Sequence, residues 1–135
     1  MAKPLKEWSF HVRGPIPRHD LPHGHGRRGR PFVPDDVKAW RRRLADAFIK
    51  AGGMPPMAGQ YMYVQYTYKF AGDDHADMDS LTHAAQDALT KDAFGIHDKE
   101  WQGEYTRDRQ PARSVASEST RVTVALYESG SAQDG

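Results

Sequence analysis

The segment from residue 61 to residue 70 constrains the fold more than any other part of the chain. Its even-numbered positions, from Met62 to Phe70, are all apolar or aromatic, whereas its odd-numbered positions include Gln65, Thr67 and Lys69. Alternation with a period of two places successive side chains on opposite faces of an extended backbone. Aromatic and β-branched side chains also suit a pleated surface. The segment therefore predicts a strand that is buried on at least one face.

Two other segments repeat their apolar residues at the helical spacing of three and four positions. The first covers residues 34–51, begins with Pro34 and two acids, and ends at a Gly-Gly pair. The second begins near Ser80, and its apolar residues from Leu81 to Leu89 keep the helical spacing throughout. Proline and acids favour a helix start, serine favours the N-cap, and glycine favours a helix end. We therefore expect two amphipathic helices.

Three further segments predict strands, at residues 8–13, 99–107 and 121–128. Residues 18–31 predict a basic loop, residues 108–118 a polar hairpin loop, and residues 129–135 a disordered tail. The order of elements is then β-α-β-α-β-β. This order favours an α+β fold in which two main helices pack against a mixed sheet. A length of 135 residues fits one domain, spanning residues 1–135.

Composition excludes several classes of protein. No apolar run approaches the ~20 residues that cross a membrane, and the first six residues lack the apolar core of a signal peptide. The chain has no cysteine, which removes disulfide frameworks, cysteine-ligated zinc and thiol nucleophiles. We expect a cytoplasmic protein that does not associate with a membrane.

Charge is distributed unevenly along the chain. The first 50 residues contain 12 Lys/Arg and 5 Asp/Glu, whereas the next 50 contain 3 and 8. A basic surface beside an acidic site is one interpretation, and ordinary solvated charge is the alternative. In the first interpretation, contacts with nucleic-acid phosphates would give affinity but little base specificity. The candidates in the basic loop are Arg18, Arg27, Arg28 and Arg30.

Asp77 and Asp79, beside the start of the second predicted helix, are candidate metal ligands. If residues 76–79 are extended, both carboxylates point to the same side, and the helix amides favour negative charge there. Asp98 precedes the next predicted strand and would supply a third acid. Carboxylate ligands without cysteine favour Mg²⁺ or Mn²⁺ over zinc. The alternative is that the aspartates only cap the helix.

These elements and acids together resemble the RusA family of Holliday junction resolvases, endodeoxyribonucleases of bacteria and phages. The family pattern is Arg-Asp-Leu-Asp-Asn followed by a lysine, then an Asp-Ala-Leu helix end, then an Asp-Asp pair. Residues 76–83, 87–89 and 97–98 are similar to these three parts. The glycine- and proline-rich turn at residues 14–18 and the tryptophan-bearing helix at residues 34–51 resemble the family's opening as well.

The resemblance implies a homodimeric nuclease that depends on Mg²⁺, with Mn²⁺ as a substitute, and cuts four-way junctions and other branched DNA in recombination and repair. It implies that Asp77, Asp79 and Asp98 hold the metal. His83 stands where the family has its lysine and becomes a further catalytic candidate. Histidine is charged only when protonated, so we expect activity to depend on pH more than in lysine-bearing relatives. Supporting roles are assigned to Ser80, Asp87 and His97.

The chain departs from the family pattern around its acids, where it has Ala76, Ser80, His83 and His97. Two alternatives follow from these departures. A catalytically degenerate relative would bind branched DNA without cutting it. A site of histidines and aspartates could instead hold a transition metal and hydrolyse a different substrate.

Overall fold

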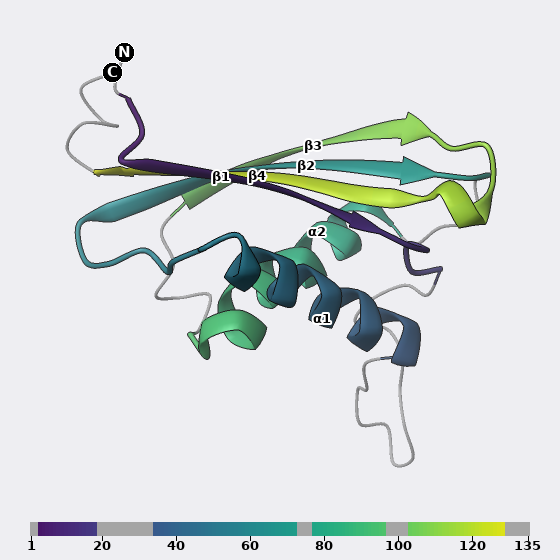
Figure 1. Ribbon diagram of the computed structural model, residues 1–135, viewed down its shortest axis with the longest axis horizontal. Helices are drawn as coiled ribbons and strands as arrows, with labels where there is room; N and C mark the ends of the chain where they lie inside the picture. Colours follow the sequence, from purple (N-terminus) through teal and green to yellow (C-terminus); the bar gives the residue numbers. More distant parts are fainter. Residues whose placement is uncertain (1–2, 19–33, 73–76, 97–102, 129–135) are drawn as a thin grey trace.

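A four-stranded mixed sheet organises the computed structural model, which describes residues 3–18, 34–72, 77–96 and 103–128 (Figure 1). The strand order is β1-β4-β2-β3. β4 is antiparallel to both of its neighbours, whereas β2 and β3 are parallel. The predicted α+β class and the order β-α-β-α-β-β are confirmed. The strands are β1 (Lys6–Arg13), β2 (Gln60–Phe70), β3 (Gly103–Pro111) and β4 (Ser119–Glu128).

Both helices, α1 (Asp35–Lys50) and α2 (Met78–Asp87), lie on one face of the sheet (Figure 1). α2 continues into a π-helical turn, Ala88–Asp92. Arg41 on α1 forms two hydrogen bonds of 2.8 Å with the Asp92 carboxylate and so joins the two helical segments. Among the described residues, no helix is long and apolar enough to cross a membrane.

The core lies between this face and the helices and follows the alternation predicted for β2. Every even-numbered residue of β2 from Met62 to Phe70 is buried, and so are the even-numbered residues of β4 from Thr120 to Leu126. Trp40 of α1 is fully buried and donates its indole N–H to Thr120 Oγ1 at 3.0 Å. This hydrogen bond satisfies two buried polar groups, as burial requires.

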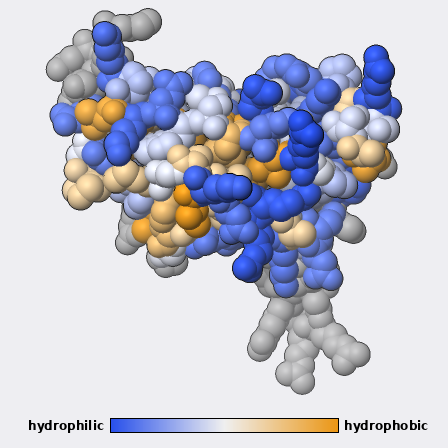
Figure 2. All heavy atoms as spheres, viewed as in Figure 1, coloured by the Kyte–Doolittle hydropathy of each residue, from blue (hydrophilic) through white to orange (hydrophobic). Residues whose placement is uncertain are grey.

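The opposite face of the sheet carries no helix within the described residues, and we call it the open face (Figure 1). Odd-numbered residues of β1, β2 and β4 lie on it, including His11, Thr67 and Arg121, which are partners in the strand register. In the space-filling view, hydrophilic side chains predominate along the rim of the molecule on this side (Figure 2).

The predicted third strand at residues 99–107 is shifted in the structure. Within the described residues β3 spans Gly103–Pro111, so residues 108–111 belong to a strand and not to the expected hairpin loop. All nine β3 residues are exposed. The strand therefore has no apolar face to create an alternating pattern, and its position depends on backbone pairing with β2.

One buried carboxylate, that of Glu118 just before β4, joins three segments at one end of the sheet. The Glu118 side chain is fully buried, although it carries a charge. Oε1 accepts hydrogen bonds from the Ile16 amide at 3.0 Å and from Arg18 Nη1 at 2.9 Å. Oε2 accepts from Arg18 Nη2 at 2.6 Å and from the Ala71 amide at 2.7 Å. The carboxylate thus links the chain beyond β1 and β2 to the start of β4.

This environment lowers the pKa of Glu118. Burial acts to raise the pKa, but the hydrogen bonds from Arg18, Ala71 and Ile16 and the charge of Arg18 outweigh it. Because the folded pKa lies below the ordinary value of 4.5, the ionised group stabilises the fold above that pH. The stabilisation is lost as the pH falls through the folded pKa.

We predict that Glu118→Ala lowers the free energy of unfolding by about 3–5 kcal/mol, because Arg18 loses its partner. We also predict that Glu118→Gln removes part of the acid sensitivity of the wild-type protein. Urea unfolding between pH 3 and pH 7 measures both effects. A loss under about 1 kcal/mol, as for a surface ion pair, or identical acid limbs in wild type and Glu118→Gln, would contradict this role.

Candidate active site at the start of helix α2

Asp77 is the N-cap of α2, and its carboxylate faces the first turn of the helix. Asp77 Oδ2 accepts hydrogen bonds from the Asp79 amide at 3.2 Å and the Ser80 amide at 3.4 Å. The prediction that Ser80 is the N-cap is therefore wrong, and Asp79 is helical, so the condition of an extended segment over residues 76–79 is not met. The alternative that an aspartate caps the helix is confirmed for Asp77. Aspartate is as good an N-cap as serine, and it satisfies amides that the helix leaves unpaired.

Asp79 lies in the first turn of α2, and its Oδ1 forms an ion pair with Arg107 Nη1 of β3. The Asp79 side chain is 66% exposed, and that of Arg107 is 34% exposed. Both groups are accessible to solvent and to a ligand, so the pair is a surface contact that can exchange partners.

A second arginine from β3 lies on the same side of the strand as Arg107. Arg109 Nη2 donates to the Gly72 carbonyl at 2.8 Å, and its guanidinium lies 5.5 Å from the centre of the Phe70 ring. The parallel register pairs Arg107 with Tyr66 and Arg109 with Tyr68, both on the helix side of β2. β3 therefore presents two guanidinium groups on the helix side of the sheet, Arg107 at the start of α2 and Arg109 at the end of β2.

The sequence-based interpretation missed Arg107 and Arg109. It ended the third strand at residue 107 and placed residue 109 in a loop. The arginines are two positions apart, and such a spacing places both on one face of a strand. That spacing was the available signal, but it has meaning only once residues 103–111 are known to be extended.

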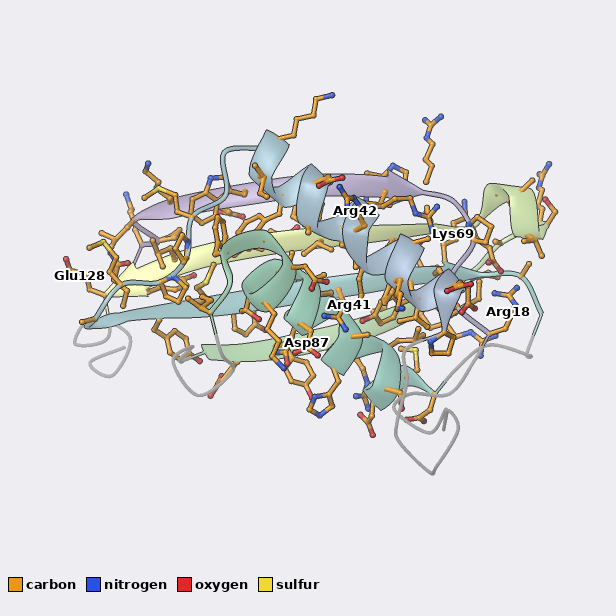
Figure 3. All side chains as sticks on the ribbon, turned by 90° about the horizontal axis from the view of Figure 1, so that it is seen from below. Arg18, Arg41, Arg42, Lys69, Asp87 and Glu128 are labelled. Atoms are coloured by element: carbon orange, nitrogen blue, oxygen red, sulfur yellow. The ribbon has the colours of Figure 1, made fainter. Side chains whose placement is uncertain are left out.

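The other predicted residues of α2 lie at different distances from Asp79 along the helix. His83 is exposed one turn after Asp79, at a spacing that makes helix residues neighbours. Asp87 is eight residues beyond Asp79, about 12 Å along the axis, and its Oδ1 lies 3.8 Å from Lys91 Nζ. Figure 3 shows Asp87 on α2, on the helix side of the sheet.

Several predicted site residues lie outside the described residues. These are the third acid Asp98, its neighbour His97, and the loop arginines Arg27, Arg28 and Arg30. Arg18 is described, and its guanidinium binds the Glu118 carboxylate and the Ile16 carbonyl. Its side chain is 25% exposed, so its main contacts are structural.

The described residues include ligands of the type that a divalent metal prefers, but fewer of them than a complete site needs. Within residues 3–18, 34–72, 77–96 and 103–128, no group of three histidine, cysteine or acidic side chains is close enough to hold a metal ion. Asp77 and Asp79 contribute two carboxylates, which are the ligands that Mg²⁺ prefers. A third ligand would have to come from elsewhere, and Asp98 is the candidate by sequence.

No family model matches the sequence, and no curated protein matches it. The residues at the start of α2 and the resemblance in the sequence therefore indicate what this site can do.

We predict that Asp77→Ala lowers the free energy of unfolding by about 1 kcal/mol, because two helix amides lose their acceptor. Asp77→Ser and Asp77→Asn keep an acceptor and should lie within a few tenths of a kcal/mol of wild type. Thermal unfolding followed by circular dichroism measures all three variants. If Asp77→Ser is as destabilising as Asp77→Ala, the cap is not what the aspartate contributes.

Proposed function

We propose that the protein is a Mg²⁺-dependent endonuclease that hydrolyses phosphodiesters at branched DNA, as the resemblance to RusA resolvases implies. The observation that supports the proposal is the solvent-accessible pairing of the Asp79 carboxylate with the Arg107 guanidinium at the start of α2, next to the N-cap carboxylate of Asp77. Arg109 lies two positions further along the same face of β3. Acids that bind a metal and cations that bind phosphates are the two components that phosphodiester hydrolysis needs.

Asp77, Asp79 and Asp98 would hold the metal, which when bound supplies Lewis-acid activation of water and of the phosphate. Asp77 is oriented by its bonds to the α2 amides. These amides and the helix dipole favour negative charge at this place. Both acids therefore lie at the N-terminal end of α2, where they would bind a cation together.

Arg107 and Arg109 would hold the phosphates that flank the scissile bond. The family pattern has an arginine at the position of Ala76, which this chain lacks. Arg107 on β3 instead brings a guanidinium to Asp79. A planar guanidinium donates two parallel hydrogen bonds to a phosphate, which suits this role. His83, one turn along α2, would add a charge when protonated.

In this proposal the protein acts in the cytoplasm as a homodimer. A two-fold symmetric pair of sites suits the symmetry of a four-way junction, because each site would nick one of two opposing strands.

The ion pair between Asp79 and Arg107 favours one alternative, a protein that binds branched DNA without cutting it. In that case Arg107 neutralises Asp79 permanently, and the site recognises phosphates without a metal. Metal-dependent cleavage distinguishes the two functions.

We predict that the protein nicks a labelled synthetic four-way junction near its branch point when Mg²⁺ or Mn²⁺ is present, and that it leaves a linear duplex intact. Asp79→Asn should abolish cleavage because a metal ligand is lost. Asp46→Asn is the matched control, since Asp46 is an exposed acid on α1 whose ion pair in the described part of the chain is with Arg42. Tight junction binding with no nicks between pH 6 and pH 9 would favour the binding protein and refute the nuclease.

We predict that Arg107→Ala binds Mn²⁺ more tightly than wild type, by up to about fivefold, because an exposed ion pair contributes up to about 1 kcal/mol. Cleavage by this variant should nevertheless be slower, since a phosphate contact is lost. Mn²⁺ titration by electron paramagnetic resonance and single-turnover cleavage measure the two effects. Weaker Mn²⁺ binding in Arg107→Ala would show that Arg107 supports the metal site and does not compete with it.

A further inference from the structure

The open face of the sheet carries a cluster of cationic side chains at the end that Glu118 organises. Arg121 is the register partner of His11 on one side and of Thr67 on the other. Arg13 and Lys69 both pair with Ser119 in the next row. A groove of about 400 Å³ runs between these side chains. We call it the cationic groove, and the residues used below are His11, Arg13, Lys69, Ser119 and Arg121.

The cations of the groove have no acidic partner in the part of the chain that the structure describes. No ion pair within the described residues involves Arg13, Lys69 or Arg121. The Glu118 carboxylate is buried against Arg18. Asp108, beside Thr67 on β3, is the acid closest to the groove in the register. Three unpaired cations around one groove create a positive potential that attracts anions.

His11 lies within this field. Burial lowers the pKa of His11, and the charges of Arg121, Arg13 and Lys69 lower it further. An anion bound in the groove would oppose all three charges and raise the pKa of His11.

The other end of the open face is aromatic. Tyr61 and Tyr63 of β2 and Tyr127 of β4 are half-buried there, and Tyr61 pairs with Tyr127 in the register. Tyr63 is six residues from Lys69, or about 20 Å along the strand. The acids Glu7 and Glu104 flank Tyr63 in its row. Burial, followed by a hydrogen bond to Glu104, raises the pKa of Tyr61 to about 12.

We propose that the open face binds an unpaired nucleic-acid strand, with its phosphates in the cationic groove and its bases stacked on the tyrosines. The strand would run lengthwise along the open face. At one end its phosphates would contact Arg13, Lys69 and Arg121. At the other end Glu7 and Glu104 would turn the phosphates away from the sheet, so that the bases contact the tyrosines. Tyrosine rings provide the stacking platform on which single-strand binding depends. A duplex hides its base faces and could use only the cationic end.

This inference does not require the proposed nuclease. The open face and the start of α2 lie on opposite faces of the sheet, and binding to the open face needs no metal. A chelator therefore separates the two: with EDTA present, cleavage stops, whereas binding to the open face should persist.

Fluorescence anisotropy of the full-length protein in EDTA tests the proposal, with a labelled oligothymidine of about 12 nucleotides. A matched abasic oligomer and an oligouridine complete the ligand set. We expect affinity to fall with salt, and Arg121→Ala to reduce the slope of log K against log salt by about 0.7, the share of one phosphate contact. Lys50→Ala removes an exposed cation from α1 and should leave the slope unchanged. The oligouridine shows whether RNA or DNA is the better ligand.

The stacking part is tested at Tyr63. Tyr63→Ala should weaken oligothymidine binding about 5- to 100-fold without changing the salt slope, whereas Tyr63→Phe should bind like wild type because it keeps the ring. Neither variant should change binding of the abasic oligomer. Thermal unfolding of each variant establishes that it is folded before binding is compared.

Three outcomes would overturn the proposal. In the first, Lys50→Ala reduces the salt slope as much as Arg121→Ala, which would mean that binding is not confined to the open face. In the second, Tyr63→Ala weakens the binding of abasic and normal oligomers equally, which would mean that no base stacks on the ring. Light scattering without nucleic acid could show an oligomer that Arg121→Ala dissociates, so that a second copy of the chain occupies the open face.

Discussion

The buried ion pair between Glu118 and Arg18 determines how the ends of β1, β2 and β4 meet. The Glu118 carboxylate accepts four hydrogen bonds from Ile16, Arg18 and Ala71. The backbone carbonyl of Glu118 accepts a further hydrogen bond from the Gly14 amide at 3.0 Å. A buried charge is tolerated only with such complete pairing. The end of the sheet that it organises carries the cationic groove, and the chain that leaves β2 there leads to α2. Arg18 and Lys69 lie toward this end, and Glu128 lies at the other (Figure 3).

β3 contributes both arginines of the candidate active site, although it adds nothing to the core. All of its residues are exposed, and its contacts include the backbone ladder to β2, the Arg107–Asp79 pair, the Arg109 bond to Gly72 and the Tyr105 ring against Tyr66. Such an element opens more readily than strands with buried side chains. Its charged residues also discourage pairing of this edge strand with another chain. The same residues can therefore prevent aggregation and bind phosphate.

The sequence predicts the parts of the fold that depend on periodic burial. The alternation in β2 and the helical spacing in α1 are strong because each element packs against the core on one face only. β3 could not be located, because a strand with no buried residue has no such pattern. The N-cap Asp77 was assigned to Ser80, since both residue types cap helices equally well. Glu118 gave no local signal: its burial depends on Arg18 and Ala71, which are 100 and 47 positions away.

The register of β3 links the two surfaces. Arg107 faces Asp79 on the helix side, whereas its neighbour Asp108 lies in the row of Thr67 on the open face. A shift of β3 by one residue would exchange the two side chains, because adjacent residues of a strand point to opposite faces. Asp108 would then lie beside Asp79, where two carboxylates repel each other, and Arg107 would join the cations of the open face. The ion pair at Asp79 therefore favours the register in which each face keeps its own charge pattern, and the proposed active site depends on that register.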